Sequence, residues 1–145
     1  QPWRSCPHPH RLALDHARPN SPPGGAAAAG DAAKPAAKTP SPETIAALNA
    51  AALTHSRDMS VQNRPWHFGS DGSSPLLRVQ RVRYTGTLLG ELISETYQTE
   101  LETLSAWMAQ PDTRGVILDP RARELGFSWF QEQRGKIWWT AVTGG

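Results

Sequence analysis

The chain has 145 residues, 15 lysines and arginines against 13 acidic residues, and a formal net charge of +2. This length suits one domain with a real core, and the scattered arginines lack the basic stripe that is typical of nucleic-acid-binding proteins. The single cysteine, Cys6, excludes an internal disulfide, a zinc ribbon and a CxxC redox site, and no stretch approaches the roughly 20 apolar residues of a membrane-spanning helix.

The N-terminal segment, residues 1–40, is expected to combine a short helix with a flexible stretch. The stretch HRLALDHARPN predicts a short helix over residues 10–19, which ends at a proline. Residues 20–40 consist almost entirely of Ala, Gly, Pro, Lys and small polar residues. Because these side chains offer little to bury, we expect a flexible segment there.

A long helix is predicted over residues 41–60. Ser41 supplies an N-cap hydroxyl, and Pro42 suits the first helical position. Apolar residues recur near helical spacing at Ile45, Leu48, Ala52 and Met59. His55 lies on the same face as two of them, so we expect a partly buried histidine that is hydrogen-bonded to backbone.

A second helix is predicted over residues 99–109. The sequence TELE at its start is typical of a capping box, and Pro111 follows its end. We expect its packing face to consist of Leu101, Leu104 and Met108.

The last stretch of the chain predicts a β-hairpin. Residues 124–133 and 136–143 are rich in aromatic and β-branched side chains and flank Arg134-Gly135. Helices followed by adjacent strands indicate an α+β domain, in which helices pack on a small antiparallel sheet.

Two residues are the candidates for chemistry. His67 lies in PWHFGSDGSSP, a stretch whose Pro, Gly and Ser residues favour a loop, and Glu91 is the one carboxylate in the apolar run LLGELIS. The loop lacks the G-x-S-x-G pattern of a serine hydrolase and the several carboxylates of an EF-hand. Glu91 either points to solvent on a strand edge or points inward, in which case it needs a histidine or backbone donors beside it.

Five motifs, in this order, resemble those of the bacterial branch of the CAP superfamily, named for cysteine-rich secretory proteins, antigen 5 and pathogenesis-related 1 proteins. They are AALTHSRDM, WHFGSDGSS, GELI, LSAWMAQPDTRGVILDPRARELGFSW and GKIWWTAV. The likeness covers about residues 41–145, which are therefore expected to form the CAP (SCP-like) domain core. It implies a three-layer α-β-α sandwich and a protein that is secreted or located in the periplasm or cell envelope.

The resemblance also implies a central polar cleft. Two histidines and two acidic residues line it in the family, and in some members they bind a divalent metal. His67 falls on the first histidine and Glu91 on the first acid, whereas Gln110 replaces the second acid and Thr113 the second histidine. The match of His67 and Glu91 to the family's cleft implies that their side chains lie within hydrogen-bonding reach or share one ordered water. Because one His and one Glu are too few ligands for a tight zinc site, we expect no metal and no other cofactor.

Two functions of different classes fit this pattern. The leading interpretation is a binding or interaction domain, expected to be monomeric, whose residual cleft of His67, Glu91, Gln110 and Thr113 takes a small molecule, a lipid or a protein. The five tryptophans beyond residue 60 are interpreted as core packing rather than as the wall of a lipid pocket. The alternative is a peptide or ester hydrolase with His67 as base, oriented by Glu91, and a hydroxyl of Ser70, Ser73 or Thr113 as nucleophile or water holder.

Overall fold

The computed structural model describes residues 39–145, of which Pro40–Gly145 form one compact unit. The helix expected over residues 10–19 and almost all of the flexible segment expected over residues 20–40 lie outside the described residues. The described part of the chain contains four helices and three strands: α2 (Pro42–Gln62), α3 (Pro75–Arg81), β1 (Leu88–Ser94), α4 (Glu100–Ala109), α5 (Pro111–Ile117), β2 (Glu124–Gln131) and β3 (Ile137–Gly144). None of these four helices combines the length and the hydropathy that crossing a membrane requires.

Helix α2 begins where its sequence predicts and extends two residues further than expected. The Ser41 hydroxyl accepts a hydrogen bond from the Thr44 backbone N–H at 3.2 Å, and Pro42 occupies the first turn. The helix ends at Asn63, which adopts the left-handed conformation with φ of 51°.

Helix α4 also matches its predicted bounds, but the prediction of its packing face is wrong. Leu101 is 73 % exposed and Leu104 is 45 % exposed, whereas Thr103 and Trp107 are buried. The indole of Trp107 offers the larger apolar area, and its Nε1–H donates to the Ile93 carbonyl at 3.0 Å. Packing of this one aromatic side chain therefore decides which face of the helix meets the sheet.

Two short helices were not predicted. Helix α3 follows Ser74-Pro75, the same cap signal that starts α2, and the Ser74 hydroxyl accepts from the Leu77 N–H at 3.1 Å. Helix α5 follows Gln110-Pro111 without a side-chain cap. Seven residues give too little hydrophobic periodicity to detect in the sequence.

The three strands form an antiparallel sheet in the order β1-β3-β2. The predicted hairpin is confirmed, and Gly135 in its turn has a φ of 97°, a conformation that favours glycine. Every residue of the central strand β3 is buried. The register pairs Glu91 with Val142 and Leu92 with Ala141, so these two pairs face opposite sides of the sheet.

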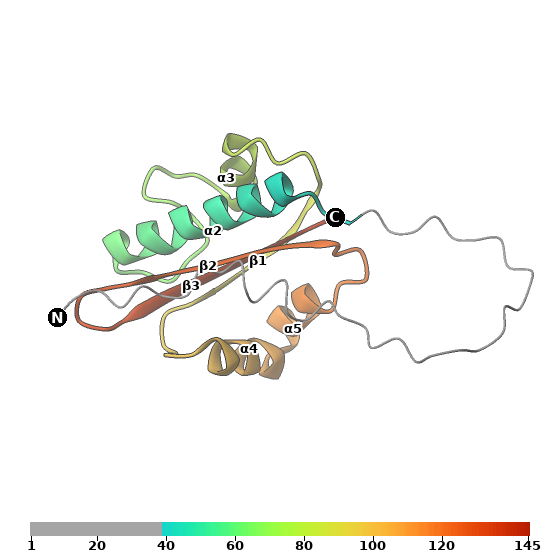
Figure 1. Ribbon diagram of the computed structural model, residues 1–145. Coiled ribbons are helices and arrows are strands. Elements are labelled where there is room, and N and C mark those ends of the chain that lie inside the picture. The colour runs from blue at the N-terminus through green and yellow to red at the C-terminus, as the bar shows by residue number, and fades with distance from the viewer. Residues whose placement is uncertain (1–38) are drawn as a thin grey trace, which may run out of the picture. The chain divides into compact units, whose positions relative to one another are not determined.

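Helices cover both faces of this sheet, with α2 and α3 on one side and α4 and α5 on the other (Figure 1). The first face buries the apolar side chains of Leu48, Ala51, Ala52, Val79 and Val142. The second buries those of Leu92, Trp107, Ile137, Trp139 and Ala141. This arrangement confirms the α+β, three-layer α-β-α sandwich.

Candidate functional site

The site is built around Glu91, which β1 directs toward α2. Its neighbour Leu92 enters the apolar cluster on the opposite face, because successive strand residues alternate. The Glu91 side chain is only 3 % exposed. A carboxylate with so little contact with water requires a charged partner inside the protein.

Arg78 of α3 is that partner. One of its terminal nitrogens, Nη2, lies 2.9 Å from Glu91 Oε1 and 2.7 Å from Oε2. The same nitrogen donates to the His67 carbonyl at 2.8 Å, and Nη1 donates to the Ser73 carbonyl at 3.1 Å. Arg78 is itself buried, so one guanidinium neutralises the carboxylate and holds the loop from His67 to Ser73 at both ends.

The His67 side chain lies against the same carboxylate. Its Nδ1 is 3.0 Å from Glu91 Oε1, which confirms the expected approach of the two side chains. An ionised carboxylate can only accept, so Nδ1 is the donor and Nε2 is the nitrogen left for other partners. The His67 side chain is half exposed, in contrast to the buried Glu91.

His55 completes the cluster from α2. It is fully buried, and its Nε2–H donates to the Trp66 carbonyl at 2.7 Å, as expected for a histidine hydrogen-bonded to backbone. Its Nε2 also lies 3.6 Å from Glu91 Oε1, while its Nδ1 has no hydrogen-bond partner. Burial lowers the pKa of His55, and the attraction of Glu91 opposes that effect only in part, so the ring is neutral.

Gln110 and Thr113 lie at the junction of α4 and α5, the helix pair on the other face of the sheet. The Thr113 hydroxyl donates to the Trp107 carbonyl and also lies 3.3 Å from the Gln110 carbonyl. Neither side chain is hydrogen-bonded to His67 or Glu91. The structure thus brings together two of the four expected residues, and a cleft shared with the other two stays a prediction.

The donor set does not fit the divalent metal that the resemblance implies. Nowhere in residues 39–145 do three or more His, Cys, Asp or Glu side chains converge as metal ligands would. Both Glu91 oxygens contact Arg78, His67 turns Nδ1 toward the carboxylate, and His55 gives its Nε2–H to a backbone carbonyl. A catalytic zinc ion requires about three protein ligands with free lone pairs.

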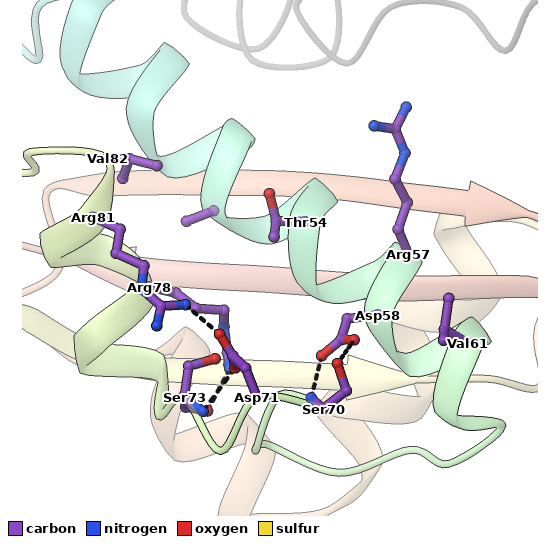
Figure 2. A pocket seen from close by; sticks show the side chains of 11 residues that line it. Thr54, Arg57, Asp58, Val61, Ser70, Asp71, Ser73, Arg78, Arg81 and Val82 are labelled. Carbon is purple, nitrogen blue, oxygen red and sulfur yellow. Dashed lines mark hydrogen bonds and ion pairs between the residues drawn. The ribbon is translucent and has the colours of Figure 1, made fainter.

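A groove of about 600 Å³ lies beside this cluster, between α2, α3 and the loop that leads into α3 (Figure 2). Arg78 lies at its wall and connects it to Glu91. Asp58 accepts from the backbone N–H and the hydroxyl of Ser70, both at 2.6 Å, and Asp71 pairs with Arg81 at 2.6 Å. The Ser73 and Arg81 hydrogen bonds lower the pKa of Asp71. Both carboxylates thus already stabilise the loop itself.

The hydroxyls proposed as nucleophiles have other partners or no access. Ser70 donates to Asp58, Thr113 to the Trp107 carbonyl, and Ser73 is 3 % exposed. None of them is hydrogen-bonded to His67. The imidazole is oriented by Glu91, but none of these three hydroxyls lies against it.

The tryptophans do form packing, as interpreted from the sequence. The Trp139 ring stacks on Phe127 at a centroid distance of 5.8 Å and lies 5.6 Å from Trp129, while Trp107 meets Phe127 edge-on. Trp138 is fully buried on the other face. Of the five tryptophans in the described part of the chain, only Trp66 lies near the site, where it contacts Phe68 edge-on.

Sequence reasoning missed the two residues that define the site electrostatically. Arg78 was not recognised because an arginine in a short helix usually lies in solvent. The sequence hinted at such a residue only indirectly, because a carboxylate in an apolar run, such as Glu91, requires a cation beside it when it is buried. His55 was correctly expected to be buried, but its nearness to Glu91 depends on the packing of α2 on the sheet, which it contacts at β2 and β3, and is not visible in the sequence.

Comparison with known proteins agrees with this architecture. The model of the cysteine-rich secretory protein family, CAP, matches residues 15–142, which includes part of the segment before Ser41. No curated protein matches the sequence significantly. The match to the family model thus carries the assignment at the level of sequence.

Two solved structures share the fold. An outer surface protein from Borrelia burgdorferi superposes with a TM-score of 0.62 at 13 % identity, over 68 % of this chain and 73 % of that one. An extracellular protein containing an SCP domain, from Bacillus anthracis str. Ames, superposes with a TM-score of 0.60 at 22 % identity, over 67 % of this chain and 31 % of that one. The likeness to the second protein thus spans about a third of its length. Because the family model matches most of the chain and both structures share its sandwich, the chain belongs to the cysteine-rich secretory protein (CAP) family.

Proposed function

We propose that this chain is an exported binding domain of the CAP family, which recognises its ligand at the surface around His67 and does not hydrolyse it. Export is supported by the two structural neighbours, one named an outer surface protein and the other described as extracellular. The expected location is outside the cytoplasm, in the envelope or beyond it.

The main support for a binding role is that both carboxylate oxygens of Glu91 already accept hydrogen bonds from protein groups. Its carboxylate accepts from Arg78 at both oxygens and from His67 at one, and it is almost fully buried. Accepting a proton would leave the buried Arg78 cation unpaired, which costs several kcal/mol, about 3 to 5. The carboxylate therefore fixes the imidazole in place and takes no part in proton transfer.

The surface that remains suits recognition. The His67 side chain is half exposed and the adjacent Phe68 is 47 % exposed, so a ligand meets one polar and one aromatic contact. A small molecule, a lipid head group or a protein side chain offers the matching chemistry. The proposal keeps Gln110 and Thr113 as further residues of the cleft.

Two measurements test the proposal. Panels of generic ester and peptide substrates should show no turnover above buffer, with the wild type or with His67→Ala. A fragment screen by ¹H–¹⁵N correlation spectroscopy should give ligands that shift the amides of residues 66–68, and these shifts should disappear in His67→Ala.

The exposed Leu101→Ala on α4 is the matched control, which should keep the ligand shifts. Turnover that His67→Ala abolishes while its spectrum remains folded would make the chain a hydrolase. Fragments that bind only away from residues 66–68 would place recognition elsewhere.

A further inference from the structure

We infer that the guanidinium of Arg78 is the resident cation of this cleft and takes the place of a divalent metal ion at Glu91. The inference concerns the same cleft as the proposed function but does not depend on it, because it predicts metal affinity rather than ligand binding or turnover. It follows from the position, the burial and the anchoring of Arg78.

The position of Arg78 blocks the carboxylate edge. A single nitrogen, Nη2, lies 2.7 Å from Oε2 and 2.9 Å from Oε1 of Glu91, so it spans both oxygens. A metal ion that bound the carboxylate through both oxygens would occupy that same edge. His67 Nδ1 takes a further position at Oε1, at 3.0 Å.

The charge of Arg78 is permanent. A guanidinium does not lose its proton in proteins, and both members of the pair are at most 4 % exposed, so little water screens the repulsion of a second cation. A metal ion must therefore displace Arg78 before it reaches Glu91.

Displacement would also release the loop. The same guanidinium donates to the carbonyls of His67 and Ser73, so moving it breaks three sets of contacts at once. The guanidinium therefore also stabilises the folded loop, unlike an exchangeable bound ion.

Removal of Arg78 should have the opposite effect on metal binding. Without the guanidinium, one buried carboxylate oxygen would lie within 3.6 Å of His55 Nε2 and 3.0 Å of His67 Nδ1. Two imidazoles and a carboxylate are the ligand set of several catalytic zinc sites, and zinc would displace the protons that His67 Nδ1 and His55 Nε2 now donate to Glu91 and to the Trp66 carbonyl. Loss of Arg78 should therefore create a zinc site at Glu91.

Zinc titration of the full chain tests the predicted zinc affinity at Glu91. All variants carry His8→Ala/His10→Ala, which removes a closely spaced histidine pair that could itself bind zinc. Competition with a chromogenic chelator measures affinity, and ¹⁵N shifts of the His67 ring locate the ion. The wild-type cleft and Arg78→Lys, which keeps a cation, should show no zinc at His67. Arg78→Gln should bind at least tenfold more tightly, and Arg78→Gln/Glu91→Gln should lose the gain.

Zinc binding by the wild-type cleft that shifts the His67 ring would overturn the inference, as would an Arg78→Gln variant that folds and binds no better. If Arg78→Gln does not fold, the wild type and Arg78→Lys decide, because both keep a cation beside Glu91. Zinc that shifts the His67 ring in either protein would refute the role of Arg78.

Discussion

The two faces of the sheet are stabilised by different forces. Toward α4 and α5, the interior is aromatic, with Trp139 between Phe127 and Trp129. Toward α2 and α3, the interior contains His55, Ser56, Arg78 and Thr140 among its buried residues, together with the Glu91 carboxylate. One sheet thus separates a mainly apolar layer from a partly polar one.

This difference explains why the candidate site lies on the α2 side. Apolar packing is non-directional, so it fixes the fold without fixing the orientation of any single group. A buried polar network requires each donor and acceptor to lie in one geometry. The polar layer can therefore hold an imidazole in a defined orientation, whereas loss of one member leaves the others unsatisfied.

The largest effect is expected from Trp139→Ala on the aromatic side. Trp139 is 2 % exposed, and its Nε1–H donates to the Tyr97 carbonyl at 2.8 Å. Truncation should lower the free energy of unfolding by about 3 to 5 kcal/mol, because it leaves a large cavity. Urea unfolding followed by fluorescence measures this, and a loss below about 1 kcal/mol would contradict the packing described here.

A slightly smaller loss with a different signature is expected from Glu91→Gln. The amide keeps the shape but leaves the buried Arg78 cation without its counter-ion, at a cost of about 3 kcal/mol. Amide exchange should accelerate over residues 66–73, which Arg78 holds, more than over the hairpin. Uniform acceleration across the domain would show that the network has no local role.

Ser56 and Thr140 test whether the polar layer is cooperative. Their hydroxyl oxygens lie 2.7 Å apart in the buried contact between α2 and β3. Ser56→Ala should cost about 1 to 2 kcal/mol because it leaves the Thr140 hydroxyl without this partner. The double variant with Thr140→Val should cost less than the sum of the single changes in urea unfolding, and strict additivity would argue against coupling.

Acid should weaken the polar layer through His55. Burial holds the pKa of His55 below the value of about 6.5 that the unfolded chain has, so between these two values the unfolded state binds more protons. The free energy of unfolding should fall as pH drops from 6.5 toward the lowered value, by at most about 1.4 kcal/mol per pH unit. Urea midpoints at several pH values check this, and His55→Gln should flatten the slope.

The smallest effect is expected at the leucines of α4. Because Leu101 is 73 % exposed, Leu101→Ala should change stability by less than about 0.5 kcal/mol. Chemical denaturation of Leu101→Ala and of Trp107→Ala compares the two losses of stability. Trp107→Ala should lose much more, because Trp107 is buried in the same helix. An equal loss in the free energy of unfolding for both variants would instead support the packing face predicted from the sequence.

The sequence predicts those features that local signals determine. Cap residues place the starts of α2 and α4, and Arg134-Gly135 places the hairpin turn. The packing face of α4 depends on competition between Trp107 and the leucines, which periodicity alone does not resolve.

The candidate site divides in the same way. The pairing of His67 with Glu91 followed from the family resemblance and from the need of a buried carboxylate for a donor. The part played by Arg78 requires α3 to pack beside β1, a long-range arrangement that no local pattern in the sequence specifies.

The order of the sheet also affects how the domain reaches its native state. Strand β3 lies between β1 and β2 but follows both in the chain, and its pairing with β1 joins residues as far apart as Leu88 and Gly144. Neither outer strand has a partner until β3 arrives, so the sheet cannot assemble stepwise during synthesis. Such non-local pairing slows folding, because loop closure must precede the contacts that stabilise it.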